Sequence, residues 1–279
     1  MILSPFPRPP LPALARHLAA LVTAVMLTLP AAAQSRGPVL HAEILPGWQT
    51  PDGRRMAALR LDLPAGWHTY WRNPGEAGIA PRLDWSGSQN VASVTPIWPR
   101  PSVIEQNGYV SYGYHDQLIL PLEVTPQDPS RPVALTGDLA LGLCHETCVP
   151  ADLTVSGALR GAGGPDARIE AALATRADPA VSAGLTRATC RVEPATRGVE
   201  LTLRATLPHQ GAGERLIVEL PGSGLRVTDL RSWREGGDIV ARARLRAPGG
   251  GPVSFQRGAL AYTVLSEARM ISAEGCTAN

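Results

Sequence analysis

Two of the four cysteines in the sequence, Cys144 and Cys148, are separated by only three residues. A cysteine thiolate can attack a disulfide or bind a soft metal ion. Residues four apart in a straight strand lie about 13 Å from each other, whereas a disulfide needs Cα atoms within about 7 Å. The segment must therefore turn if the two cysteines pair, and the pair then closes a very small loop. Because closing a small loop stabilises a fold little, the spacing favours redox exchange over a purely structural bridge.

The two residues after Cys144, His145 and Glu146, are candidate modulators of thiol reactivity. A protonated His145 would lower the pKa of a neighbouring thiol, whereas Glu146 would raise it or accept a proton. Three other interpretations stay open, namely a structural hairpin disulfide, a zinc site and Cu(I) capture by two thiolates. Zinc is the weakest of them, because no second cysteine or histidine cluster completes four ligands, and we predict no metal site.

The other two cysteines, Cys190 and Cys276, are isolated and lie near the two ends of the second half of the chain. A disulfide that closes so long a loop has the largest expected effect on stability. We therefore predict a structural disulfide between them, with two free thiols as the alternative.

Segments with a strand pattern lead up to the C-x3-C motif. Apolar and polar residues alternate over 57–63, 117–124, 133–143 and 151–159, which is typical of strands with one buried face. Turn signals such as Asn73-Pro74-Gly75 separate them. Several short antiparallel strands of this kind predict a β-sandwich over residues 34–160, with the motif directly after a strand.

The composition changes after residue 160. A linker is predicted over 161–184, with a short helix from Asp166 to Arg176. Strand alternation returns over 199–207 and 238–246, so residues 185–279 are predicted to form a second, smaller β-sandwich-like domain. The expected fold class is thus mainly β.

The first 33 residues have the pattern of a secretory signal peptide. Arg8 and Arg16 precede an apolar run from Leu18 to Leu29, and a small-residue site ends at Ala33. Twelve apolar residues are too few for a helix to cross about 30 Å of hydrocarbon. We expect cleavage after Ala33 and a soluble periplasmic protein, in a compartment where cysteines are paired or in redox service.

The composition of the 279-residue chain excludes several classes of protein. Apolar residues make up 44% of it, which is enough for a core and argues against intrinsic disorder. The 28 glycines and 27 prolines disfavour an all-helical fold. All 26 basic side chains are arginines, and without the two in the signal segment they balance the acidic ones. Nucleic acid is therefore not an expected partner.

Three groups of residues together resemble a known family. They are Gly66-Trp-His-Thr-Tyr-Trp-Arg-Asn-Pro-Gly-Glu-Ala-Gly78, the Tyr112-Gly113-Tyr114 stretch that leads into 118–122, and Cys144-x3-Cys148-Val149-Pro150. This set resembles the N-terminal periplasmic domain of the DsbD thiol:disulfide interchange proteins, especially the branch with the ScsB suppressor-of-copper-sensitivity proteins. The resemblance covers residues 38–160 well and 185–279 more loosely.

The resemblance implies an immunoglobulin-like sandwich with one reactive cysteine pair and no organic cofactor. By position, Cys148 would form the mixed disulfide with a client and Cys144 would resolve it. A cap loop over 106–114, with Tyr109, Tyr112 and Tyr114, would shield the cysteines until a partner docks. Glu105 lies near the place where family members carry acidic residues beside the site.

The sequence departs from the family in two ways. The cysteine spacing is shorter than in the better-known DsbD domains, and the chain ends at Asn279 without a membrane or thioredoxin-like domain. We therefore expect a separate membrane protein as electron donor, with thioredoxin-like or disulfide-isomerase-type proteins as partners. The predicted function is periplasmic thiol:disulfide interchange of the protein-disulfide reductase type. The alternative is a non-enzymatic binding module, with Cu(I) capture linked to copper tolerance as one form of it.

Overall fold

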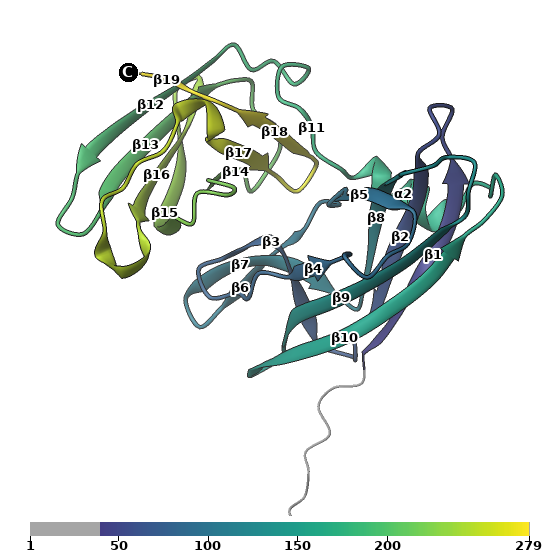
Figure 1. Ribbon diagram of the computed structural model, residues 1–279. Coiled ribbons are helices and arrows are strands. Elements are labelled where there is room, and N and C mark those ends of the chain that lie inside the picture. The colour runs from purple at the N-terminus through teal and green to yellow at the C-terminus, as the bar shows by residue number, and fades with distance from the viewer. Residues whose placement is uncertain (1–39, 279) are drawn as a thin grey trace, which may run out of the picture. The chain divides into compact units, whose positions relative to one another are not determined.

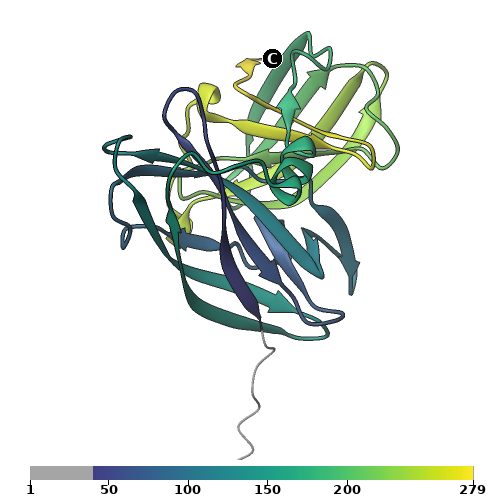
Figure 2. The same ribbon diagram turned by 90° about the vertical axis from the view of Figure 1, so that its right-hand side faces the viewer.

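The computed structural model describes residues 40–278 and is built mainly from antiparallel strands (Figures 1 and 2). Within these residues there is one α-helix, α2 (Ala167–Ala174), and two 3-10 turns (Pro248–Gly250 and Arg257–Ala259). The expected mainly-β fold is therefore confirmed. The predicted signal segment 1–33 lies outside the described residues. No helix in the described part of the chain has the length and apolar character to cross a membrane.

The strands up to residue 159 form two sheets, which we call the first sandwich. One sheet has the order β1-β2-β8-β5, and the other has the order β10-β9-β3-β7-β6 with β4 paired to β9. The strand bounds are β1 (His41–Gln49), β2 (Arg55–Asp62), β3 (His68–Gly75), β4 (Arg82–Asp84), β5 (Val91–Pro96), β6 (Ser102–Gln106), β7 (Tyr109–His115), β8 (Gln117–Pro126), β9 (Val133–Cys144) and β10 (Cys148–Leu159).

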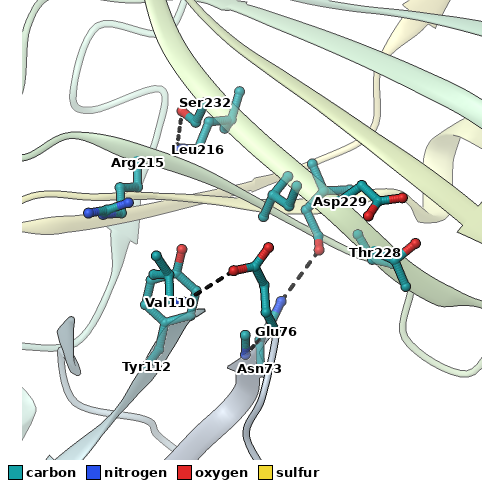
Figure 3. A pocket seen from close by; sticks show the side chains of 13 residues that line it. Asn73, Glu76, Val110, Tyr112, Arg215, Leu216, Thr228, Asp229 and Ser232 are labelled. Carbon is teal, nitrogen blue, oxygen red and sulfur yellow. Dashed lines mark hydrogen bonds between the residues drawn. The ribbon is translucent and has the colours of Figure 1, made fainter. Parts of the chain in front are cut away.

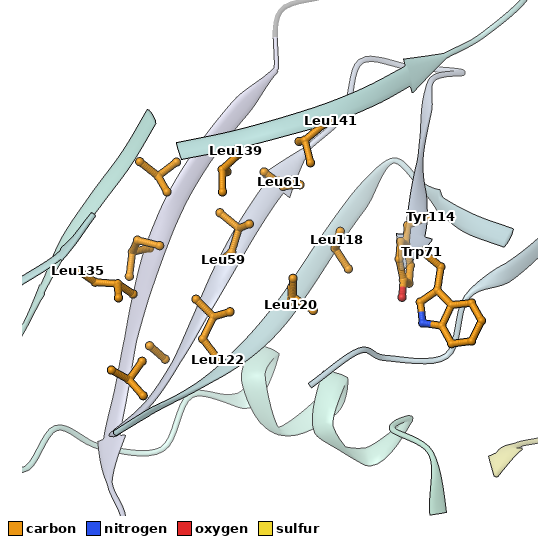
Figure 4. Packing of buried hydrophobic residues seen from close by; sticks show 14 of the residues in the cluster. Leu59, Leu61, Trp71, Tyr114, Leu118, Leu120, Leu122, Leu135, Leu139 and Leu141 are labelled. Atoms are coloured by element: carbon orange, nitrogen blue, oxygen red, sulfur yellow. The ribbon is translucent and has the colours of Figure 1, made fainter. Parts of the chain in front are cut away.

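The core of the first sandwich consists of leucines that point inward from strands of both sheets. Figure 4 shows several of them interdigitating, among them Leu59, Leu61, Leu118, Leu120, Leu122, Leu135, Leu139 and Leu141. Burying one such side chain contributes about 1.5–3 kcal/mol. Because the odd-numbered residues of β9 face this core, Cys144 at its end lies on the opposite face of the sheet.

Strand β2 differs from its predicted pattern because both of its faces are buried from Arg55 to Leu59. Alternation placed Ala58 on the exposed face, but Ala58 packs with Leu45, Met56 and Ile169 in a second apolar cluster. Ile169 belongs to α2, which starts where the Asp166 side chain accepts a hydrogen bond from the backbone N–H of Arg168. The helix therefore covers the face of β2 that the pattern left to solvent.

The predicted turn at Asn73-Pro74-Gly75 is instead the end of β3. The pairing of β3 with β7 is irregular between Tyr70 and Gly75, so the strand continues with a changed register. Gly75 has φ +79°, a conformation that favours glycine. A strand bulge therefore explains the turn-like composition of this segment.

The strands from residue 178 onward form two more sheets, which we call the second sandwich. Their orders are β11-β18-β17-β14 and β15-β16-β13-β12-β19. The strand bounds are β11 (Asp178–Pro179), β12 (Arg187–Pro194), β13 (Val199–Thr206), β14 (Arg215–Glu219), β15 (Arg226–Glu235), β16 (Asp238–Arg246), β17 (Ala261–Leu265), β18 (Met270–Glu274) and β19 (Thr277–Ala278). Strand β11, which the sequence placed in the linker, pairs with β18.

The Cys190–Cys276 disulfide joins β12 to the segment between β18 and β19. Its Cα atoms lie 5.6 Å apart, and the two cysteines are 86 positions apart in the sequence. Cys190 is buried within the core of the second sandwich, and Cys276 packs against the same core. The bridge thus ties the last strands of the chain to the first long strand of this sandwich.

Candidate functional site

A hairpin at the end of β9 brings Cys144 and Cys148 together in a disulfide. Strands β9 and β10 run side by side along their full lengths (Figure 1). The two cysteines are directly opposite each other at the turn end of this ladder. Their Cα atoms lie 4.1 Å apart, typical of a pair without ladder hydrogen bonds. The backbone N–H of His145 donates to the Thr147 carbonyl at 3.2 Å and closes the three-residue turn.

The two sulfur-bearing residues differ sharply in exposure. Cys144 is 1% exposed, whereas Cys148 at the start of β10 is exposed to solvent. An approaching reactant therefore meets Cys148 first. The structure thus distinguishes the two cysteines physically, a distinction that the spacing alone did not provide.

Tyr70 on β3 contacts both sulfur atoms. Its hydroxyl donates a hydrogen bond to Sγ of Cys144 at 2.9 Å and lies 3.5 Å from Sγ of Cys148. Burial raises the pKa of Tyr70, so the phenol stays protonated and remains a donor. A Cβ atom on Gly78 would lie 2.6 Å from Cδ1 of Tyr70, so glycine is needed where the chain passes over the ring.

Tyr70 was not among the predicted site residues, although Tyr70 and Gly78 both lie in the 66–78 stretch. The available signal was alternation along β3, which places Tyr70 and His68 on one face. Alternation does not specify which neighbouring strand that face meets. The missing information was the pairing of β3 with β9.

Tyr70→Phe is expected to weaken the stabilisation of a thiolate at the site. A hydrogen bond to a charged group contributes about 1.5–3 kcal/mol, so the pKa of the reduced thiol should rise by roughly one to two units. The measurement is an ultraviolet titration of thiolate in the reduced protein. Tyr262→Phe is the matched control, because Tyr262 is also a buried tyrosine but belongs to the second sandwich. Equal titrations of all three proteins would contradict the assigned role.

A hairpin made by β6 and β7, which we call the cap hairpin, contacts the disulfide turn. Its two-residue loop, Asn107-Gly108, has φ +53° and +81°, as expected of a tight hairpin turn. The Gln106 side-chain amide donates to the His145 carbonyl at 2.8 Å. Tyr109 at the tip is 55% exposed. The cap hairpin is therefore joined to the turn that carries the cysteines.

The predicted cap loop needs correction at Tyr112 and Tyr114. Both side chains are buried in the first core, because β7 is a strand in this region and not a loop. The Tyr114 hydroxyl donates to the Pro99 carbonyl at 2.8 Å, and burial raises the pKa of Tyr112 to about 12. Of the three predicted tyrosines, only Tyr109 lies at the exposed tip.

Gln106→Ala is expected to make the Cys144–Cys148 disulfide more accessible. One hydrogen bond contributes about 0.5–1.5 kcal/mol to stability. Its loss should therefore make reduction of the disulfide by a water-soluble phosphine roughly two- to tenfold faster. Gln117→Ala is the control, because Gln117 donates to Asp62 at a site that involves neither cysteine. Unchanged reduction of the Gln106 variant would show that this contact does not limit access.

The three predicted modulators have different surroundings. His145 is exposed beside Trp67, with ring centroids 6.0 Å apart, and Glu146 is exposed in the same turn. Glu105 forms an ion pair with Arg215 of the second sandwich at 2.6 Å. Its carboxylate is therefore engaged by an arginine of the second sandwich, and its role as a modulator of the cysteine pair stays a prediction.

A separate small cavity of about 80 Å³ is shown in Figure 3. Its lining includes Asn73, Glu76, Tyr112, Arg215, Asp229 and Ser232 and shares no residue with the disulfide site. Within residues 40–278, no cluster of three or more histidine, cysteine or acidic side chains has the arrangement of a metal site. The cavity and the disulfide site therefore lie at different places in the fold.

Comparisons with known proteins found a matching family and a similar solved structure. Residues 41–158 match the family described as thiol:disulfide interchange protein DsbD, N-terminal, which confirms the resemblance over that range. The crystal structure of the N-terminal periplasmic domain of ScsB from Proteus mirabilis is similar, with a TM-score of 0.62 and 21% sequence identity. The likeness covers 86% of this chain and 92% of that one, so the shared fold extends beyond the family match. No curated protein sequence matches the chain.

Proposed function

We propose that the protein is exported to the periplasm and exchanges electrons with partner proteins through Cys144 and Cys148. The observation that carries the proposal is a disulfide with one exposed and one buried cysteine, whose two sulfurs share a single tyrosine hydroxyl. The disulfide closes so small a loop that its chain-entropy contribution is about 2 kcal/mol. A purely structural role would require neither the shared tyrosine hydroxyl nor the difference in exposure between the two cysteines. The family match over residues 41–158 supports the same chemistry.

The proposed reaction proceeds in two exchange steps from the reduced pair. The Cys148 thiolate attacks a client disulfide, one client sulfur leaves as a thiolate, and a mixed disulfide forms. Cys144 then attacks Sγ of Cys148 and releases the second client sulfur. The protein's two thiols lose two electrons in total, and the client disulfide becomes a dithiol.

The partners we propose are thioredoxin-like or disulfide-isomerase-type proteins, with a separate membrane protein as electron donor. Residues 34–160 would form the redox domain, 161–184 the linker and 185–279 the second domain. Glu105, His145 and Glu146 stay proposed modulators, and the cap hairpin would limit oxidation of the reduced pair until a partner displaces it. The contact between Gln106 and the His145 carbonyl supports this last role.

The experiment mixes the reduced protein with an oxidised thioredoxin-fold protein that carries an exposed C-x-x-C disulfide. Thiols are alkylated at intervals and counted on each protein by mass spectrometry. The expected result is stoichiometric transfer, faster than from glutathione at the same thiol concentration. A variant with both Cys144→Ser and Cys148→Ser is the control, because it retains the Cys190–Cys276 bridge. Transfer no faster than from glutathione would contradict the proposal.

A further inference from the structure

Four reactive or titratable side chains form one row across four neighbouring strands. In the register of the sheet, Cys148 is opposite Cys144, Cys144 is opposite His68, and His68 is opposite His115. Directly opposite residues of antiparallel strands point to the same face, with Cβ atoms about 4.5–5.5 Å apart. The row therefore runs from the exposed cysteine through the buried one to a pair of histidines.

His68 is the buried histidine of this row and is 4% exposed. Its ring lies edge-on to Tyr70 with centroids 5.3 Å apart, and its centroid is 5.4 Å from that of His115. Among residues 40–278, no hydrogen bond engages a His68 ring nitrogen. His115 at the end of β7 is exposed. A path of two imidazoles thus leads from the buried cysteine toward solvent.

The titratable groups that face His68 are Cys144 on β9, Tyr70 on the same strand, His115 on β7 and His145 in the disulfide turn. Burial lowers the pKa of His68 below its usual 6.5, and the charges of His115 and His145 lower it further. A neutral imidazole can accept a proton, whereas Tyr70 is held as a proton donor.

We propose that His68 accepts the Cys144 proton in the second exchange step and that His115 passes it toward solvent. This inference rests on the proposed function. As Cys144 Sγ bonds to Cys148 Sγ, the bond between Cys148 and the client breaks, and the client sulfur leaves with the electron pair. The Cys144 proton moves to His68 and then, through His115 or water, to the client thiolate. The client disulfide supplies the oxidant, so electrons and protons balance.

The test follows the reduced protein as it reacts with the aromatic disulfide dithiobisnitrobenzoate, which releases a coloured thiolate in each step. The first release reports attack by Cys148, and the second reports resolution by Cys144. In His68→Gln the first phase is expected to keep its rate, whereas the second slows about tenfold or more at neutral pH. Without the imidazole, the second phase should increase only with ionisation of the thiol itself, near pH 8.5.

Three further variants separate loss of the base from a general effect of substituting a histidine. His68→Phe retains an aromatic ring against Tyr70 but removes the base, and it should behave as His68→Gln does. His115→Gln is expected to slow the second phase less, and His209→Gln, an exposed histidine of the second sandwich, should change nothing. A second phase with the unsubstituted protein's pH profile, or equal slowing of both phases, would overturn the role of His68. Absence of both phases in the unsubstituted protein would overturn the proposed function as well.

Discussion

Replacing Cys148 by alanine is expected to reduce the formation of mixed disulfides with client proteins by about a hundredfold or more, as removal of a reacting nucleophile does. Replacing Cys144 by alanine is expected to make the same mixed disulfides accumulate. The physical reason is exposure, because the attacking sulfur must reach a client disulfide and Cys144 is only 1% exposed. Cys144 needs to reach only Cys148, its direct cross-strand neighbour.

The asymmetry is measured by mixing each reduced variant with an oxidised thioredoxin-fold protein and separating the products without reductant. Mass spectrometry then identifies the linked cysteines. A variant with both substitutions controls for attack by other residues. Accumulation of the mixed disulfide in Cys148→Ala, with none in Cys144→Ala, would reverse the assignment of roles.

Removal of the Cys190–Cys276 bridge is expected to lower the free energy of unfolding more than removal of the Cys144–Cys148 disulfide does. For a loop of this length the chain-entropy contribution is about 4.6 kcal/mol, and measured losses for native disulfides are typically about 2–5 kcal/mol. The variant with Cys190→Ala and Cys276→Ala should therefore unfold at a lower urea concentration. Its exchange activity should persist, because neither cysteine contacts the Cys144–Cys148 site.

The comparison protein for this prediction is the variant with Cys144→Ala and Cys148→Ala. Its small loop gives an expected loss of only about 2 kcal/mol in the same chain-entropy account. Urea unfolding of both double variants, followed by circular dichroism, gives the two free energies. A larger loss from the Cys144–Cys148 variant would mean that the small disulfide is a principal structural bridge.

Sequence patterns predicted the features that depend on nearby residues. Alternation identified β9 and β10, and the short helix was expected because Asp166 precedes an apolar stripe that contains Ile169. The C-x3-C spacing implied a turn, which the structure contains as a three-residue loop. These features follow from local propensity and periodicity.

The features that the sequence did not predict depend on pairing between distant segments. Tyr70 reaches Cys144 across 74 positions, and Glu105 meets Arg215 across 110. The register that aligns His68 with Cys144 cannot be read from either strand alone. Tyr112 was misassigned because its glycine-rich and tyrosine-rich neighbourhood resembles a loop, although it alternates into the core as a strand residue. Strand register and tertiary packing determined these positions.

The reduction potential of the Cys144–Cys148 pair decides between redox exchange and a structural bridge. The protein is equilibrated in glutathione buffers of graded ratio, its thiols are trapped, and the two disulfides are followed separately by mass spectrometry. A value between about −270 and −120 mV, the range of thiol–disulfide exchange proteins, is the predicted result. A value below about −300 mV, with both cysteines inert to alkylation, would mark a structural bridge and contradict the account.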